Sequence, residues 1–260
     1  MAPLTPASRP VLVTRPAREA AAWVQALSAR GLAAHALPLI EIAPAPDAGA
    51  LAAARAGLAG CGAVMFVSAN AVDGFLGDER AWPPGVRAWA TGPGTRDALL
   101  RHGVPPAQVD APAADASQFD SERLWEQVRA QARPGAQVLI VRGADAQGRL
   151  AGRPWLAGQL ADAGAAVAQV VAYARRLPAL DATQRALAQA AAEGRGWWLF
   201  SSSEAVDNLR SLWPGQDWSA ARALCTHPRI AQAAQGMGLG TVAQSRPSVD
   251  DVAAFLQSTP

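Results

Sequence analysis

The stretch FVSANAV at residues 66–72 ends an apolar strand and runs directly into small polar residues, and FSSSEAV at residues 200–206 repeats it. An apolar run followed by Ser or Asn and then by helix-forming residues is typical of a buried strand that leads into a helix. This turn brings hydroxyl groups and backbone amides to the end of a strand. Three interpretations are open: a serine nucleophile, a helix cap, or a cap that also faces a ligand.

Short apolar strands alternate with Ala-rich amphipathic helices along the whole chain, which predicts an α/β protein with parallel sheets. Strands are expected at 11–14, 34–44, 63–68, 86–91, 137–143, 165–178, 197–200, 223–226 and 240–245. Helices are expected at 16–30, 50–59, 95–102, 120–132, 156–163, 181–193, from 203, from 228 and at 248–257, with a loop at 104–117.

The two halves of the chain resemble each other. The Arg that follows a strand at Arg15 returns at Arg142, FVSANAV returns as FSSSEAV, and ATGPGT (90–95) returns as CTHPRI (225–230). The segment 27–44 likewise matches the segment 160–178. Four correspondences in the same order predict an internal duplication, with chance similarity between βα units as the alternative. Two such domains facing each other would place a ligand cleft near the carboxyl ends of their strands.

Composition narrows the classes of function. Of the 260 residues, 50% are apolar and 17% are charged, and the formal net charge is +2. These values are typical of a globular protein and do not indicate nucleic acid as a partner. Every basic residue is Arg, because the chain has no Lys. Lysine Schiff-base chemistry and a Walker-type phosphate site are therefore excluded.

The sequence also predicts a cytoplasmic protein without a membrane partner. Cys61 and Cys225 form neither a CxxC pair nor a disulfide framework, as expected in a reducing cytosol. The N-terminal residues lack the apolar segment of a signal peptide. No apolar run approaches the roughly 18 residues that a membrane span requires. Since the helical faces carry no additional apolar stripe, a monomer is expected.

The polar residues after the two strands are candidates for capping and for anion binding. Ser201 and Glu204 have the spacing of a capping box, and Ser68 or Asn70 can satisfy free amides in a first helical turn. Helix N-termini also bind carboxylates and phosphates through these amides and through the helix dipole. The occurrence of the same device in both repeats favours anion binding.

Nucleophilic and metal chemistry lack support in the sequence. Neither Ser68 nor Ser202 lies in the G-x-S-x-G pattern of a hydrolase elbow. His35, His102 and His227 are scattered and give no metal-ligand spacing, and His102 is interpreted as a structural residue at a helix end. The stretch TGPGT (91–95) lacks the third glycine of a dinucleotide fingerprint.

Two Arg residues and one Tyr are further candidates. Arg15 and Arg142 follow strands directly, so each is either a clamp for a carboxylate or an ordinary surface charge. Tyr173 is the only tyrosine in the chain. It is either a half-buried packing residue or, if it faces a cleft, a group that donates a proton to a leaving group.

The chain contains, in this order, VLVTRP, LPLIEIAP, FVSANAV, ATGPGT, VLIVRG, VVAYARRLP, FSSSEAV and THPRIAQAA. These stretches resemble the motifs of the uroporphyrinogen-III synthase family, over about residues 11 to 256. The resemblance implies two flavodoxin-like α/β domains joined by a two-stranded linker. The first domain would be discontinuous and comprise 1–37 and 178–260, the second would comprise 44–170, and the linker strands would be 38–43 and 171–177.

The resemblance also implies the reaction. Enzymes of this family close the linear tetrapyrrole hydroxymethylbilane to uroporphyrinogen III, with inversion of the last pyrrole ring through a spiro intermediate and loss of water. They need neither cofactor nor metal, and a hand-over of substrate from hydroxymethylbilane synthase is expected. Uncatalysed closure gives the symmetrical isomer, so positioning and exclusion of water are the effects to expect from the protein.

Residue by residue, Tyr173 matches the family's tyrosine proposed to assist departure of the hydroxyl group. Ile230 stands at the second-repeat counterpart of Thr95, so the two half-sites differ there. The cleft-lining positions of the family correspond to Thr14, Arg15, Ser68, Asn70, Thr95, Arg142, Ser202, Ser203, Thr226 and His227.

Two other classes of function fit duplicated α/β domains. One is a cytosolic ligand-binding or sensing protein without turnover, which would need an effector surface or a DNA-binding segment. The other is an enzyme that acts on nucleotide sugars. Binding of uridine diphosphate sugars or of a porphyrinogen in a thermal-shift screen distinguishes these classes from the synthase.

Overall fold

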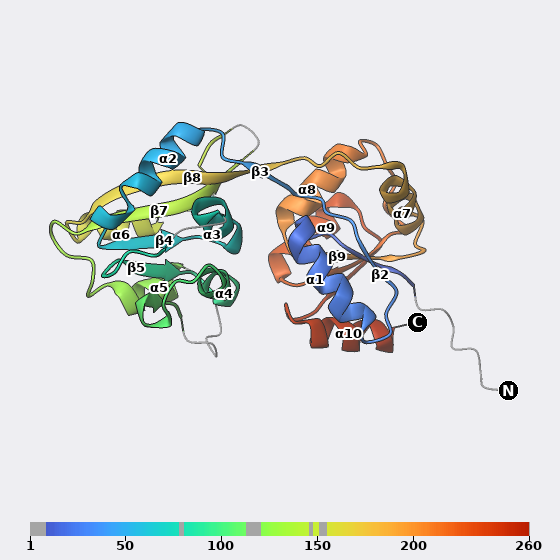
Figure 1. Cartoon of the computed structure of the whole chain (residues 1–260). Coiled ribbons are helices and arrows are strands. Elements are labelled where there is room, and N and C mark those ends of the chain that lie inside the picture. Colours follow the sequence, from blue (N-terminus) through green and yellow to red (C-terminus); the bar gives the residue numbers. More distant parts are fainter. Residues whose placement is uncertain (1–8, 78–80, 113–120, 146–147, 151–154, 260) are drawn as a thin grey trace. The chain divides into compact units, whose positions relative to one another are not determined.

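The computed structural model describes residues 9–77, 81–112, 121–145, 148–150 and 155–259. The chain divides into two compact units (Figure 1). Unit 1 comprises the residues up to Glu41 and from Arg176 onward, and unit 2 comprises Ile42–Arg175. The chain passes between the units within the segments 38–43 and 171–177, whose role as a linker remains a prediction.

Unit 1 is a parallel five-stranded sheet between two layers of helices (Figure 1). Its strand order is β11-β10-β9-β1-β2. Parallel strands covered on both faces are apolar at nearly every position, as the β9 sequence WWLF shows. The strands are β1 (Val11–Val13), β2 (Ala34–Ala36), β9 (Trp197–Phe200), β10 (Arg222–Cys225) and β11 (Thr241–Gln244). Helices α1 (Ala17–Ser28) and α10 (Val249–Ser258) cover one face, and α7 (Ala182–Ala192), α8 (Ser203–Leu212) and α9 (Pro228–Met237) cover the other.

Unit 2 is a six-stranded sheet with the order β3-β8-β7-β4-β5-β6. Helices α2 (Ala48–Ala56), α3 (Ala69–Leu76) and α4 (Pro93–Arg101) pack on one face around Phe66 and Phe75. Helices α5 (Ser121–Val128) and α6 (Trp155–Asp162) pack on the other face. The strands are β3 (Glu41–Pro44), β4 (Ala63–Phe66), β5 (Arg87–Ala90), β6 (Val109–Asp110), β7 (Gln137–Ala144) and β8 (Ala166–Arg176).

The two units share one topology. Each strand of unit 1 has a counterpart in unit 2. The unit 1 order β2-β1-β9-β10-β11 corresponds, strand by strand, to β8-β7-β4-β5-β6 in unit 2. Numbered from the first strand of each repeat, the order is 2-1-3-4-5, which is the flavodoxin-like doubly wound order. The predicted α/β fold with parallel sheets is confirmed, and the shared order supports the duplication inferred from the sequence.

Two predictions of local structure are wrong. The segment 34–44 forms two strands, β2 and β3, because residues 37–40 leave the extended pattern around Pro38. The segment predicted as a loop at 104–117 contains a short 3-10 helix at Pro106–Gln108 and the strand β6, while its residues 113–117 lie outside the described residues. A two-residue strand at the edge of a sheet is too short to produce a periodic pattern.

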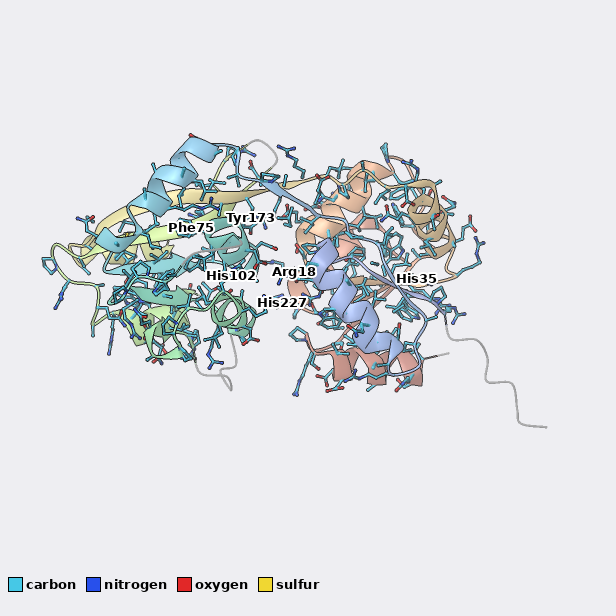
Figure 2. The ribbon with its side chains drawn as sticks, viewed as in Figure 1. Arg18, His35, Phe75, His102, Tyr173 and His227 are labelled. Atoms are coloured by element: carbon cyan, nitrogen blue, oxygen red, sulfur yellow. The ribbon has the colours of Figure 1, made fainter. Side chains whose placement is uncertain are left out.

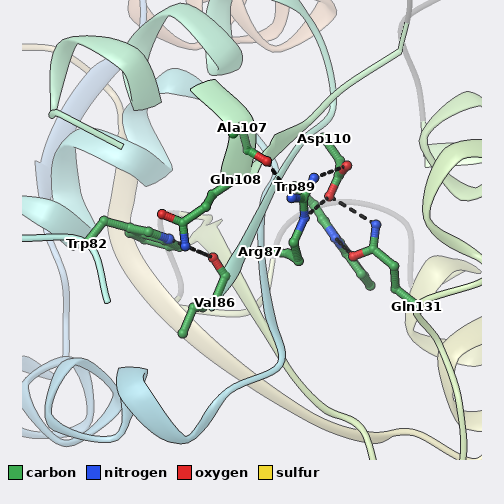
Figure 3. Close-up of polar contacts among 8 residues, drawn as sticks. All are labelled: Trp82, Val86, Arg87, Trp89, Ala107, Gln108, Asp110 and Gln131. Carbon is green, nitrogen blue, oxygen red and sulfur yellow. Dashed lines mark hydrogen bonds and ion pairs between the residues drawn. The ribbon is translucent and has the colours of Figure 1, made fainter. Parts of the chain in front are cut away.

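A polar cluster attaches β6 to the rest of unit 2 (Figure 3). Arg87 Nε donates to Asp110 Oδ2 at 2.8 Å, and Arg87 Nη2 donates to Asp110 Oδ1 at 2.5 Å. Gln131 Nε2 also donates to Asp110 Oδ2, at 3.1 Å, and Gln131 Oε1 accepts from Trp89 Nε1 at 3.0 Å. The hydrogen bond to Asp110 is the main cause of a raised pKa of the Arg87 guanidinium. Asp110 is therefore the shared acceptor of the cluster.

Replacing Asp110 with Ala is expected to lower the free energy of unfolding by about 1–2 kcal/mol, because Arg87 and Gln131 lose their shared acceptor. The value is modest because the Arg87 side chain is 34% exposed and water replaces part of the interaction. Urea unfolding followed by Trp fluorescence measures the change. Asp162→Ala, an exposed acidic residue at the end of α6, is the matched control and should leave the midpoint unchanged. Equal midpoints for all three proteins would contradict the role of Asp110.

Candidate active site

The residues predicted from FVSANAV lie at the carboxyl end of β4, beside β7 in unit 2. These two strands flank the point at which a doubly wound sheet changes the direction of its connections, where such folds bind ligands. Ser68 is the N-cap of α3, and its Oγ accepts from the Ala71 amide at 3.2 Å. The predicted cap is therefore confirmed. Asn70 lies in the first turn of the same helix.

Tyr173 reaches the same edge of unit 2 through a β-bulge. The β7–β8 register pairs Arg142 with Val171 but Gly143 with Tyr173, so Ala172 is the extra residue. Side chains alternate along a strand, and the extra residue turns the Tyr173 ring to the face that Ala172 also occupies. This is the face covered by α3.

The Tyr173 hydroxyl is the group that Ser68 contacts. Tyr173 Oη lies 3.1 Å from Ser68 Oγ, and the residue is only 6% exposed. Figure 2 shows Tyr173 on β8. A Cβ atom placed on Gly143 would lie 2.5 Å from Tyr173 Cζ, so the ring rests directly on the backbone of Gly143. The strand–helix turn and the bulge thus bring a phenol and a serine hydroxyl together.

Arg142 points away from this pair. Alternation along β7 places it with Val138 and Ile140 on the face covered by α5 and α6, where Nη1 donates to Gln169 Oε1 at 2.8 Å. The residue is 4% exposed. Burial lowers the pKa of its guanidinium, and the electrostatic effect of Tyr173 partly offsets the change. Arg142 is therefore a buried charge rather than an ordinary surface residue.

In unit 1, FSSSEAV joins β9 to α8 at the corresponding switch point beside β1. Ser202 is the N-cap, and its Oγ accepts from the Glu204 amide at 3.1 Å. The predicted capping box of Ser201 and Glu204 is wrong, because α8 begins one residue later than that box requires. The hydroxyls of Ser201 and Ser203 are buried and make no hydrogen bond within the described residues. Such hydroxyls are uncommon, because buried polar atoms in folded proteins normally have a hydrogen-bond partner.

Thr14 and Arg15 follow β1 at this edge. Thr14 is 1% exposed, and its hydroxyl donates to the Leu199 carbonyl at 2.8 Å. Arg15 Nη1 lies 3.2 Å from Glu19 Oε2, and its guanidinium lies 4.5 Å from the centre of the Trp23 ring. Burial lowers the pKa of Arg15, while Glu19 raises it. A substrate carboxylate would have to compete with Glu19 for this Arg.

Thr226 and His227 occupy the start of α9 in unit 1. Thr226 Oγ1 donates to the Phe200 carbonyl at 3.4 Å. His227, labelled in Figure 2, is the N-cap of α9. Its Nδ1 accepts from the Arg229 amide at 3.1 Å. Because Nδ1 accepts, the proton of the neutral ring is on Nε2, which is left to donate to a ligand.

The corresponding turn in unit 2 precedes α4. Thr95 is buried in the first turn of that helix. Thr91 was not among the residues predicted from the sequence. Its hydroxyl donates to the Val67 carbonyl at 3.2 Å, as that of Thr226 does to the Phe200 carbonyl. The alignment of ATGPGT with CTHPRI pairs Thr91 with Thr226 and was the signal that could have identified it.

His102 plays a separate, structural part. It is the C-cap of α4, and its Nε2 lies 2.9 Å from Asp73 Oδ1 of α3.

Within the described residues, no group of three His, Cys, Asp or Glu side chains is placed to hold a metal ion. The polar groups described at these strand ends are hydroxyls, helix-terminal amides, the Asn70 side chain, an imidazole, a guanidinium and a phenol, which suit proton donation and the binding of anions.

Comparison with known proteins identifies the class of enzyme. A family model described as Uroporphyrinogen-III synthase HemD matches residues 21–254. The chain belongs to the uroporphyrinogen-III synthase family. It is 31% identical over 187 residues to the uroporphyrinogen-III synthase of Chlorobaculum parvum, and the match covers 67% of each protein. The resemblance inferred from the sequence motifs is confirmed, and the sensing protein without turnover is not favoured.

Two solved structures of uroporphyrinogen-III synthases share the fold. The enzyme from Helicobacter pylori is 16% identical with a TM-score of 0.61, and the match covers 96% of this chain and 99% of that chain. A mutant enzyme from Thermus thermophilus is 17% identical with a TM-score of 0.54, and the match covers 96% of both chains. As a member of the uroporphyrinogen-III synthase family, the chain is a cyclising hydro-lyase of tetrapyrrole biosynthesis.

Proposed function

We propose that Tyr173 is the general acid with which the chain converts hydroxymethylbilane to uroporphyrinogen III. The observation that carries this proposal is the position of the only tyrosine in the chain. Its hydroxyl lies 3.1 Å from Ser68 Oγ, at the carboxyl edge of the unit 2 sheet and at the N-terminus of α3. A phenol at this point is next to amides that attract the carboxylates of the substrate.

The chemistry needs one proton and a well-defined geometry. The pyrrole nitrogen of the substrate donates electron density as the bond to the hydroxyl group breaks, so the main requirement is protonation of the departing oxygen. Tyr173 supplies this proton. The electrophilic carbon then reacts at the substituted position of the last ring to give the spiro intermediate. The binding groups hold the substrate so that the ring closes at this substituted carbon, which is the less accessible position.

Substrate carboxylates are bound by the polar groups that follow the strands. In unit 1 these are the buried hydroxyls of Ser201 and Ser203 and the Nε2 hydrogen of His227. In unit 2 they are the first-turn amides of α3 and the amide side chain of Asn70. Arg15 joins this set when a carboxylate replaces Glu19 as its partner. Thr14 and Thr226 hold neighbouring strands together through their hydroxyls and contribute by shaping the two edges.

The cellular setting of the reaction completes the proposal. The enzyme acts as a monomer in the cytoplasm and receives hydroxymethylbilane from the synthase that makes it. No helix in the described part of the chain is long and apolar enough to cross a membrane.

Purified protein supplied with freshly made hydroxymethylbilane tests the proposed reaction. The expected product is predominantly uroporphyrinogen III, formed faster than spontaneous closure gives the symmetrical type I isomer. Chromatography of the oxidised porphyrins separates the two isomers. A product that contains only type I would show that the chain does not catalyse this reaction.

A further inference from the structure

Three features fix the position of the Tyr173 hydroxyl more closely than packing of the ring requires. The bulge at Ala172 turns the ring toward α3, and Gly143 leaves the space that the ring fills. Ser68 Oγ then lies within hydrogen-bond distance of the phenol oxygen. A Tyr that served only as an apolar filler would not need the Ser68 hydroxyl next to its oxygen.

Either hydroxyl can donate in the Ser68–Tyr173 hydrogen bond, and the other contact of Ser68 favours Ser68 as the donor. The hydroxyl of Ser68 already accepts from the Ala71 amide at 3.2 Å, at the N-terminus of α3. A hydroxyl that accepts a hydrogen bond becomes a better donor, since neighbouring hydrogen bonds polarise one another. Ser68 is thereby prepared to donate to Tyr173. With Ser68 as the donor, the phenol hydrogen of Tyr173 is left for another acceptor.

We propose that Ser68 is a positioning residue for Tyr173, whose hydroxyl donates to the phenol oxygen and directs the phenol proton to the leaving group of the substrate. This inference rests on the proposed role of Tyr173 as the general acid. It gives Ser68 a task beyond capping α3, because it acts on the reaction through Tyr173 and not through contact with the substrate.

The bond between carbon and the hydroxyl oxygen breaks, and its electron pair goes to the oxygen. That oxygen takes the Tyr173 proton and leaves as water, while the positive charge is delocalised over the pyrrole. The phenolate keeps the electron pair of its former O–H bond and is stabilised by the Ser68 hydroxyl and by the N-terminus of α3. The proton that the final ring substitution releases restores the phenol.

Kinetics of Ser68→Ala, Ser68→Thr and a matched cap variant test the proposal. Ser68→Ala is expected to lower kcat roughly tenfold with little change in KM, since the lost interaction acts on the chemical step. Ser68→Thr keeps a hydroxyl that can cap and donate, and it should restore most of the rate. Ser248→Ala removes the cap of α10, whose Oγ accepts from the Asp251 amide, and should leave kcat unchanged.

A double-mutant cycle separates this inference from the proposed function. With Tyr173 already replaced by Phe, the further change Ser68→Ala should have no additional effect on kcat, because Ser68 acts through the lost hydroxyl. If Tyr173→Phe is slow but Ser68→Ala is as fast as wild type, the role of Ser68 is overturned and that of Tyr173 stands. If Tyr173→Phe is as fast as wild type, the proposed roles of Tyr173 and of Ser68 are both contradicted.

The single tyrosine also allows a direct measurement of the hydrogen bond. Protein labelled with ¹³C at the tyrosine ζ carbon gives one resonance from Tyr173. Ser68→Ala should shift this resonance, Ser68→Thr should return it toward the wild-type position, and Ser248→Ala should leave it unchanged. An identical resonance in wild type and Ser68→Ala would show that Ser68 does not donate to the phenol.

Discussion

Tyr173→Phe is expected to lower kcat for uroporphyrinogen III formation about 100-fold, the lower part of the range for a positioned general acid. Phe has the same ring and fills the same space against Gly143, so the loss is confined to the hydroxyl. Ser68 keeps its hydrogen bond from Ala71 and continues to cap α3. The free energy of unfolding should therefore change by about 1 kcal/mol or less.

Initial rates of type III formation, corrected for spontaneous closure, measure this effect. Because the slowed variant competes with the uncatalysed reaction, its product should also contain a larger share of type I. Urea unfolding of the same preparations provides the control for folding. A variant with wild-type kcat and an unchanged isomer ratio would remove the proposed role of Tyr173.

Gly143→Ala is expected to lower kcat nearly as much as Tyr173→Phe, although it leaves the phenol in the protein. The added Cβ would lie 2.5 Å from Tyr173 Cζ and 2.8 Å from its oxygen, distances that force the ring to move. Gly143 does not have a positive φ angle, so Ala adds no backbone strain. The ring leaves Ser68, and the crowding should also cost about 1–3 kcal/mol of stability.

Gly158→Ala in α6 is the matched control for this substitution. A Cβ at Gly158 meets no atom within 4 Å, and Ala is a better helix former than Gly. Its kcat should equal that of wild type, and its stability should rise by up to about 1 kcal/mol. Wild-type kcat in Gly143→Ala would show that the reaction tolerates a displaced Tyr173 ring.

The fold was largely predictable because parallel strands buried on both faces leave continuous apolar runs. AVMF in β4 and WWLF in β9 are such runs, and each is followed by a polar residue that caps the next helix. The edge strand β6 was not predictable in this way. It has only two residues, and it is held by the Arg87–Asp110 pair, which local sequence does not reveal.

The site was predictable in residue type but not in geometry. Ser68 was expected to cap α3 and does. The turn of the Tyr173 ring toward α3 depends on the bulge at Ala172, which alternation of apolar residues does not predict. The same alternation, read along β7, shows why Arg142 lies on the other face of the sheet. The Glu19 partner of Arg15 has i,i+4 spacing, so this pair could have been expected from the sequence.

The role of Tyr173 as the general acid is tested by the products that wild type and Tyr173→Phe form from hydroxymethylbilane at equal enzyme concentration. Chromatography of the oxidised porphyrins gives the ratio of type III to type I for each protein. Wild type should form nearly pure type III, and the variant should form a mixture rich in type I. Equal amounts of type III from both proteins, or type I alone from wild type, would contradict this role.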